Sequence, residues 1–515
     1  MNNPRPIVAR SSEDVPSPEL PETSLGQWSK GPRASPGEVG FDHAGPALSP
    51  AVHRDANELE SFEPNVPSPL ASPRPELSPT AAALFSSLEP QLTPLDHEAL
   101  LCLKREVVFS KAGTKDPEWS TLAVVLKRLA HDSMVLHFIL AASLTELSWR
   151  PTADALTSML MQARANELYM AGKEMLLRVI GSTDEEPDHF RVVVSFWFWH
   201  LQHWRDFDQN RLAHLELSGC MKDYFMQHDL VRVLSTAESR VTEPDSRVAC
   251  IARLTTWLFW DDTEACFQGH GGAFAKLLTE DPDTLIKIYA RSKGALRSNF
   301  PDYPVEQLRD DNSNELALEG LHHTRVLVQV INNILDSGGP LSPAQAGDLG
   351  NQIKDLLVGR YANVVALATS RVDSRDRLLG NADWAVANLY ALCIYLFRCC
   401  TLDDANGTAD GSATVAALPP EVSAIARDPA GLLEIMDRSL DGGPAGQLDR
   451  FQWPIFWAGI ETRDWIHHKW VLQRLTSPSL RATFGIVQDE QRTTGRRAGI
   501  VRIREACREA WCGVL

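Results

Sequence analysis

Carboxylate side chains gather in the segment Asp261-Asp262-Thr263-Glu264, directly after an aromatic run. On a helix, such a cluster could coordinate magnesium and a diphosphate, as in helical isoprenoid synthases. That chemistry needs a second acidic motif downstream, and the block Asp310-Asp311-Asn312-Ser313-Asn314-Glu315 offers carboxylates without the required spacing. We therefore favour a structural interpretation, in which the acidic pair is solvated or caps a helical hairpin. A magnesium-dependent prenyl diphosphate enzyme is the less favoured alternative.

Two pairs of adjacent histidines, His322-His323 and His467-His468, are the next candidates for metal chemistry. Neighbouring residues of a helix point about 100° apart, so one pair cannot offer two ligands on a single face. We interpret all four as core or rim histidines. Glu461, Asp464 and His468 have the spacing of one helical face, and we expect them to form a salt-bridge cluster.

An aromatic run, Phe196-Trp197-Phe198-Trp199 with Trp204, could line a ligand pocket, but such density is more typical of packing. The glycines of Gly269-His270-Gly271-Gly272 follow no strand and precede no Gly-Lys-Ser/Thr ending, so they predict a helix stop rather than a phosphate loop. We therefore assign no catalytic residue, no metal ligand and no cofactor, and we do not expect an enzyme.

The composition limits the class of partner. The chain has 515 residues, a hydrophobic fraction of 44% and a formal net charge of −17. This length is sufficient for two or three average domains or one large helical one. Binding of nucleic acid by the chain as a whole is disfavoured, because phosphate contacts need clustered Lys and Arg, and Arg496-Arg497 is the one notable basic pair near an end.

The nine cysteines are scattered, and none belongs to a Cys-x-x-Cys pair, so a zinc ribbon or finger is not supported. Their irregular spacing and the absence of a secretory signal before them predict reduced thiols in an intracellular protein. No apolar run reaches the roughly 18 residues that a membrane span needs. We therefore expect no membrane association.

The elements that must position these side chains begin after a segment of different character. Residues 1–80 are rich in Pro, Ser, Glu and Gly, a composition that cannot bury enough apolar surface to offset the entropy of ordering. We predict that they form a disordered tail. A plain extended linker is the favoured interpretation, and sites for proline-directed kinases are the alternative at the repeated Ser-Pro steps, Ser17, Ser35, Ser49, Ser68, Ser72 and Ser78.

Residues 81–515 have helical periodicity and show no β-alternation, which predicts an all-α array of antiparallel helical hairpins. A loop rich in Gly, Ala, Thr and Asp is expected from Asp403 to Pro420. The expected helices are Leu95–Phe109 with Asp96 as its cap, one or two in Trp119–Leu147, then Ala153–Ile180, Phe190–Trp204, Arg247–Phe267, Ala273–Ala295, Val305–Leu335, Pro343–Thr369, Ala382–Cys400, Leu432–Leu440, Trp453–Leu475, Leu480–Gln491 and Ile500–Trp511.

The last third contains an unusual aromatic segment, Phe451 to Trp470, with four tryptophans and a proline near its start. Trp453 is expected to be extended, because proline disfavours the α region in the residue before it. Pro454 suits a first helical turn, where no backbone N–H is needed. The segment predicts helix packing rather than chemistry.

Three segments, taken in order, resemble the fungal-specific transcription factor domain, the helical regulatory domain of fungal transcription factors of the six-cysteine zinc cluster class. The first is Arg253 to Gly272, and the second comprises Tyr289 to Arg297 and Tyr303-Pro-Val-Glu-Gln-Leu-Arg-Asp-Asp-Asn312. The third is the aromatic segment with Trp-Pro-x-Phe-x-Ala-Gly-Ile-Glu. The resemblance covers residues from about 95 to the end, and implies a large helical domain that restrains, senses or dimerises.

The zinc cluster of that class is missing, since no cysteine precedes Cys102. A relative without the cluster, a gene model lacking an upstream exon and a regulator that acts through a partner all remain open. The resemblance implies a nuclear transcription regulator whose partners are the transcription machinery or a regulatory protein, with a homodimer as a further expectation. The alternative is a non-DNA-binding helical scaffold or small-molecule sensor derived from such a regulator.

Overall fold

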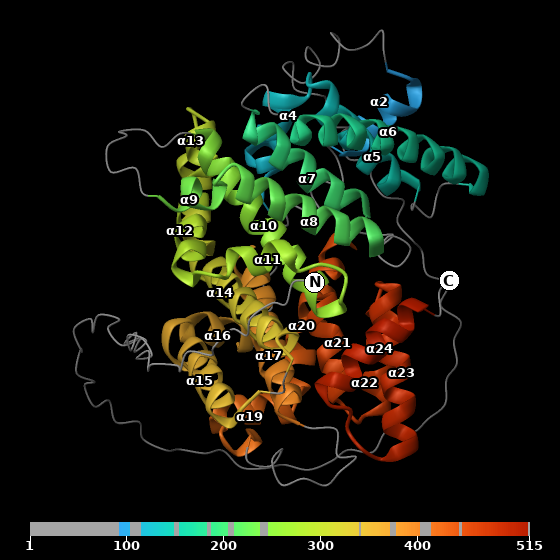
Figure 1. Ribbon diagram of the computed structural model, residues 1–515. Coiled ribbons are helices and arrows are strands. Elements are labelled where there is room, and N and C mark those ends of the chain that lie inside the picture. Colours follow the sequence, from blue (N-terminus) through green and yellow to red (C-terminus); the bar gives the residue numbers. More distant parts are fainter. Residues whose placement is uncertain are drawn as a thin grey trace, which may run out of the picture. The chain divides into compact units, whose positions relative to one another are not determined.

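The computed structural model describes residues 92–103, 115–148, 154–182, 187–203, 211–236, 246–338, 341–370, 377–401, 414–441 and 445–512. All regular structure in these ranges is helical, and they contain no strand, which confirms the all-α prediction (Figure 1). They belong to one unit, Pro75–Leu515. The tail predicted for residues 1–80 lies outside the described residues.

The helices are α2 (Pro94–Cys102), α4 (Thr121–Leu129), α5 (Ser133–Ser148), α6 (Ala155–Gly181), α7 (His189–His203), α8 (Arg211–Gln227), α9 (Leu230–Ser235), α10 (Ser246–Gln268), α11 (Ala273–Leu278), α12 (Pro282–Ser292), α13 (Ala295–Asn299), α14 (Val305–Asp336), α15 (Pro343–Lys354), α16 (Ala362–Thr369), α17 (Arg377–Cys400), α19 (Pro420–Arg427), α20 (Ala430–Asp441), α21 (Gln452–Glu461), α22 (Trp465–Arg474), α23 (Pro478–Thr494) and α24 (Ile500–Cys512), with 3-10 helices η3 (Pro117–Trp119) and η6 (Ala445–Phe451) and a π-helical turn η4 (Asp355–Arg360).

Sequential helices form antiparallel hairpins where the link between them is short. In α5 and α6, the hydroxyl of Ser158 donates to the carbonyl of Ser148 at 2.8 Å, at the turn that joins the two helices. A Cβ on Gly172 would lie 3.2 Å from Phe138, so the glycine permits close approach. In α23 and α24, Gly495 supplies the left-handed residue (φ 67°) that ends the first helix.

Helices α14 and α17, at the centre of the C-terminal half, run in the same direction, although they are distant in sequence. The side-chain amide of Asn381 on α17 donates to Asn314 on α14 at 2.6 Å. Further along, the hydroxyl of Tyr395 donates to Asn332 at 2.7 Å. Both contacts are buried, so these polar groups fix the register of two helices whose surroundings are apolar.

One helix contributes to both parts of the hydrophobic core. Leu258 and Phe259 of α10 belong to the apolar cluster built from α2 to α13, whereas Phe267 belongs to the cluster built around α14, α17 and α21. Ring contacts join Phe267 to Trp457 at 5.3 Å and to Tyr395 at 5.7 Å. Helix α10 therefore connects the two parts of the core, and it also contains the Asp261–Glu264 cluster.

Several predicted boundaries were wrong. Trp453–Leu475 is two helices, because α21 ends at Glu461 and Asp464 caps a new helix, α22, by accepting from the N–H of Ile466 at 2.8 Å. Trp453 is helical rather than extended, and Pro454 lies in the first turn of α21 as predicted. Ala273–Ala295 is two helices, α11 and α12, and it ends at the first residue of α13.

Other differences concern the residue that caps α2 and helices that were interrupted or not predicted. Thr93, not Asp96, caps α2, and Asp96 completes a capping box by accepting from the N–H of Thr93. Pro343–Thr369 is interrupted by η4, and α8 and α9 were not predicted. Among the described helices, none has the length and apolar character needed to cross a membrane.

Candidate functional site

The carboxylates of the Asp261–Glu264 cluster point to three different partners. Asp261 Oδ2 lies 3.1 Å from His200 Nε2 on α7. Asp262 accepts from the backbone N–H groups of Gly272 at 2.9 Å and Ala275 at 2.8 Å. Glu264 pairs with Arg325 on α14 at 3.2 Å. The cluster thus links α10 to its neighbours, and the hairpin-capping interpretation is confirmed for Asp262, which is buried rather than solvated.

The glycine loop after α10 brings its own backbone onto Asp262. Gly269 and Gly272 have φ values of 81° and 93°, in the left-handed region that glycine adopts without strain. A Cβ on Gly272 would lie 2.4 Å from Cys266 Sγ. The segment therefore ends α10 as predicted, and turns the N–H groups of α11 toward Asp262 and Ser218, whose hydroxyl accepts from Ala273 at 2.9 Å and Phe274 at 3.2 Å.

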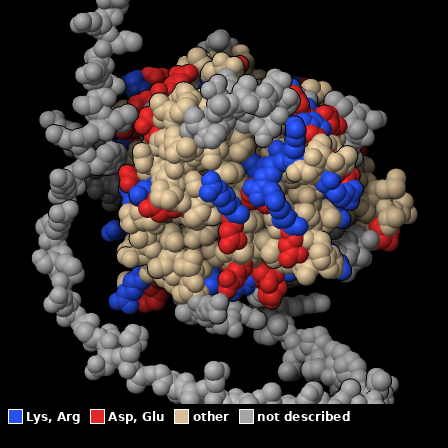
Figure 2. Space-filling model, turned by 90° about the horizontal axis from the view of Figure 1, so that it is seen from below, with Lys and Arg blue, Asp and Glu red and all other residues tan. Residues whose placement is uncertain are grey.

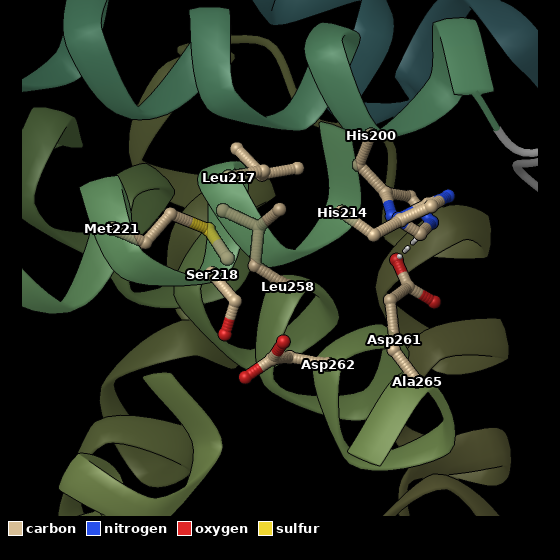
Figure 3. A pocket seen from close by; sticks show the side chains of 9 residues that line it. All are labelled: His200, His214, Leu217, Ser218, Met221, Leu258, Asp261, Asp262 and Ala265. Carbon is tan, nitrogen blue, oxygen red and sulfur yellow. Dashed lines mark ion pairs between the residues drawn. The ribbon is translucent and has the colours of Figure 1, made fainter. Parts of the chain in front are cut away.

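A small cavity lies beside this cluster, between α7, α8 and α10 (Figure 3). Its volume is about 10 Å³, the space of one water molecule. In Figure 3 the imidazoles of His200 and His214 lie beside Asp261, and the hydroxyl of Ser218 points toward Asp262. Its lining is His200, His214, Leu217, Ser218, Met221, Leu258, Asp261, Asp262 and Ala265.

Three buried histidines from three different elements meet near this cavity. The ring centroids of His200 and His214 are 5.8 Å apart, and those of His214 and His270 are 5.5 Å apart. These three histidines were not predicted to meet, because only adjacent histidines were considered. No local spacing relates positions on α7, α8 and the glycine loop. Among the described residues, no group of three or more His, Cys, Asp or Glu is arranged to hold one metal ion.

Burial controls the charge of the acidic groups. It raises the pKa of Asp262, and the N–H groups donated by Gly272 and Ala275 partly oppose the shift by stabilising the carboxylate. Burial likewise raises the pKa of Glu264, against the nearby positive charge of Arg325. Desolvation raises the pKa of the Cys266 thiol to about 12, so this thiol is not an activated nucleophile.

Replacing Asp262 by alanine should destabilise the protein by about 1–3 kcal/mol, because two buried backbone N–H groups lose their acceptor. The matched change Asp261→Ala should cost less than about 1 kcal/mol, because it removes one partly exposed ion pair. Urea unfolding followed by circular dichroism measures both. Equal losses for the two variants would contradict the capping role of Asp262.

The carboxylates of the second acidic block, residues 310–315, also contact different basic partners rather than one another. Asp311 lies 2.5 Å from the ammonium of Lys115 and accepts from the hydroxyl of Tyr303 at 2.5 Å. Glu315 pairs with Lys293 on α12 at 2.5 Å. Asp310 pairs with Arg377 at the start of α17. These pairs fix the first turns of α14 against other elements, which is a structural role.

The adjacent histidines of α14 are core and rim residues, as predicted. His322 is fully buried, stacks on Tyr289 with ring centroids 4.4 Å apart, and accepts from the indole N–H of Trp260 at 3.1 Å. His323 is half-buried and its Nδ1 lies 2.6 Å from the hydroxyl of Tyr361. Burial and nearby positive charge lower the pKa of His323 to about 4, and burial lowers the pKa of His322 well below its usual value.

The predicted salt-bridge cluster of Glu461, Asp464 and His468 was wrong, because the helix breaks between them. Glu461 is buried and pairs with Arg398 and Arg497. Asp464 caps α22, and Nε2 of His468 lies 2.9 Å from the carbonyl oxygen of Thr462. His467 and His468 are half-buried rim residues.

The aromatic run Phe196–Trp199 is packing, as favoured. All four side chains are buried in the core, where Trp199 meets Tyr169 with ring centroids 6.0 Å apart. Trp204 lies outside the described residues.

Comparisons with family models, curated proteins and solved structures give no match to this chain.

Proposed function

We propose that this chain is a transcription regulator of the fungal type, acting in the nucleus through contacts made by its helical domain rather than through catalysis. The proposal rests on the three segments that resemble the fungal-specific transcription factor domain. One observation supports it: the first segment packs against both the second and the third, although the third is distant in sequence.

Residues of all three segments take part in that packing. Phe267 of the first segment contacts Trp457 and Phe456 of the third, with ring centroids 5.3 and 6.0 Å apart. The second segment closes on itself through Tyr303 and Asp311, and its Tyr289 stacks on His322, which accepts from Trp260 of the first. Motifs that are linked through contacts with one shared helix, here α10, are expected to occur together, as they do in this chain.

The roles of the acidic clusters also support a function through protein contacts rather than through catalysis. Their carboxylates are used to cap α11 and to join α10 and α14 to their neighbours, as described above. The cavity beside Asp261 has the volume of one water molecule, about 10 Å³, so it offers no room for a diphosphate or a small organic effector.

A reporter assay tests the proposal without knowledge of target genes. The full chain is fused to a DNA-binding domain of another protein and expressed with a reporter that carries that domain's operator. We expect transcription of the reporter to change by several-fold relative to the DNA-binding domain alone. An unchanged reporter with a folded wild-type fusion would count against the proposal.

The alternative function is a helical scaffold or sensor derived from such a regulator, and the sequence feature that favours it is the lack of cysteines before Cys102. A gel-shift assay with genomic fragments separates the two in part. A sequence-specific shift by the chain alone excludes the scaffold, whereas its absence combined with an active reporter fusion indicates a regulator that reaches DNA through a partner.

A further inference from the structure

Three arginines come together where α17, α19, α21 and α24 have adjacent ends. Arg427 is the last residue of α19, Arg463 lies in the link between α21 and α22, and Arg497 lies in the link between α23 and α24. Arg427 and Arg463 are exposed, and Arg497 is half-buried. We call these three residues the arginine face. It lies at the lower end of the domain in Figure 1, and Figure 2, which views the molecule from below, shows Lys and Arg gathered at the centre.

Electrostatic interactions place the arginines close to one another. Burial and the neighbouring charges of Arg398 and Arg427 lower the pKa of Arg497 to about 10. Burial and the charge of Arg463 do the same to the pKa of Arg398, again to about 10. Arg427, Arg463 and Arg497 therefore lie close enough to Arg398 or to one another for their positive charges to interact.

The carboxylates around the arginine face are already engaged. Glu461 is buried and pairs with both Arg398 and Arg497. Asp428 accepts from the N–H of Ala430 at 3.1 Å, and Asp464 caps α22. One buried carboxylate therefore faces several guanidinium groups, and this end of the domain is positive in a chain whose net charge is −17.

An apolar patch begins next to the arginine face. Trp465 and Ile466, which follow Arg463 at the start of α22, are 70% and 57% exposed. Leu472, two turns along the same helix face as Trp465, is 37% exposed. Tryptophan and arginine are the residue types most enriched at the centres of protein–protein interfaces.

We propose that the arginine face and Trp465–Ile466 together bind a segment of a partner protein that alternates acidic and apolar residues. Its carboxylates pair with the guanidinium groups, which present paired N–H donors in a fork that matches a carboxylate. Its apolar side chains cover Trp465 and Ile466. The inference extends the proposed function by naming the chemistry of the partner, and its test is independent of transcription because it measures binding alone.

The experiment uses the full chain and a fluorescein-labelled synthetic peptide in which Asp and Glu alternate with Leu and Phe, followed by fluorescence anisotropy. We expect saturable binding that weakens as NaCl is raised, because exposed charges are screened. A peptide with Lys at every acidic position should not bind. The double change Arg427→Glu with Arg463→Glu should weaken binding by about tenfold or more, and Trp465→Ser by about tenfold.

Matched variants on other surfaces control for a general effect of charge or apolar area. Arg309→Glu reverses an exposed arginine on α14, and Leu212→Ser removes an apolar side chain that is 80% exposed on α8. Neither should change the affinity. Circular dichroism of each variant confirms that it is folded.

Three outcomes would overturn the inference. One is no binding of the acidic peptide at millimolar concentration, and another is equal loss of affinity with the control variants. The third is tighter binding of a single-stranded oligonucleotide of equal charge that responds to the arginine changes but not to Trp465→Ser, which would assign the face to nucleic acid.

Discussion

Replacing Arg398 by methionine is expected to lower the free energy of unfolding by about 3–5 kcal/mol, because the change removes one of the two basic partners of the buried carboxylate Glu461. Arg398 is fully buried on α17 and lies 2.7 Å from Glu461 on α21. It also donates to the backbone carbonyls of Ala498 at 3.0 Å and Ile460 at 3.1 Å. One side chain thus joins three segments, and methionine fills its volume without replacing any of these bonds.

Urea unfolding measured by circular dichroism provides the test, and two further variants sharpen it. Arg502→Met removes exposed ion pairs with Glu490 and Glu509 and should cost less than about 1 kcal/mol. Arg398→Met combined with Glu461→Leu removes both charges and should be more stable than Arg398→Met alone. If the double variant is no better than the single one, the loss does not come from the buried charge of Glu461.

The helices of this domain could be predicted from sequence because their apolar residues repeat at helical spacing over long stretches. α10, α14 and α17 were placed within a few residues of their observed ends, apart from the five residues Arg377–Asn381 that precede the predicted start of α17. The break after Glu461 was missed because it spans only three residues, 462–464, and apolar residues resume directly after it. The capping residue Asp464 was visible in the sequence, but it was assigned to a charge cluster instead.

The contacts that organise the candidate site could not be predicted, since they join positions remote in sequence. The sequence suggested that Asp262 could cap a helical hairpin, but it did not identify the N–H groups that Asp262 accepts from. Those N–H groups are placed by the left-handed turn at Gly269 and Gly272. Arg398 stands within an apolar helix segment, and nothing local to it identifies Glu461 as its partner. The close approach of α21 to α23 is permitted by Gly459, where a Cβ would lie 2.8 Å from Phe484.

Acidification from pH 6.5 to pH 4 should destabilise the domain through its buried histidines, and His323 should account for about 3 kcal/mol of the loss. Its pKa in the folded protein is about 4, below the ordinary value of 6.5. A base whose pKa is lowered by folding contributes stability that is complete above its unfolded pKa. That stability is lost as the pH falls through the folded value, because the unfolded chain takes up the proton first. His322, whose pKa burial also lowers well below its usual value, adds to the loss in the same direction.

The variant His323→Gln isolates this effect from that of the carboxylates, which also titrate as the solution becomes acidic. Glutamine can still meet the hydroxyl of Tyr361 but cannot take up a proton. The stability of wild type relative to His323→Gln should therefore fall as the pH is lowered from 7 to 4, in urea unfolding at several pH values. His131→Gln, at an exposed position, serves as the matched control and should not alter the pH dependence by a comparable amount. Parallel pH profiles for wild type and His323→Gln would mean that His323 is protonated equally in the folded and unfolded chains, and that the acid sensitivity of the domain arises elsewhere.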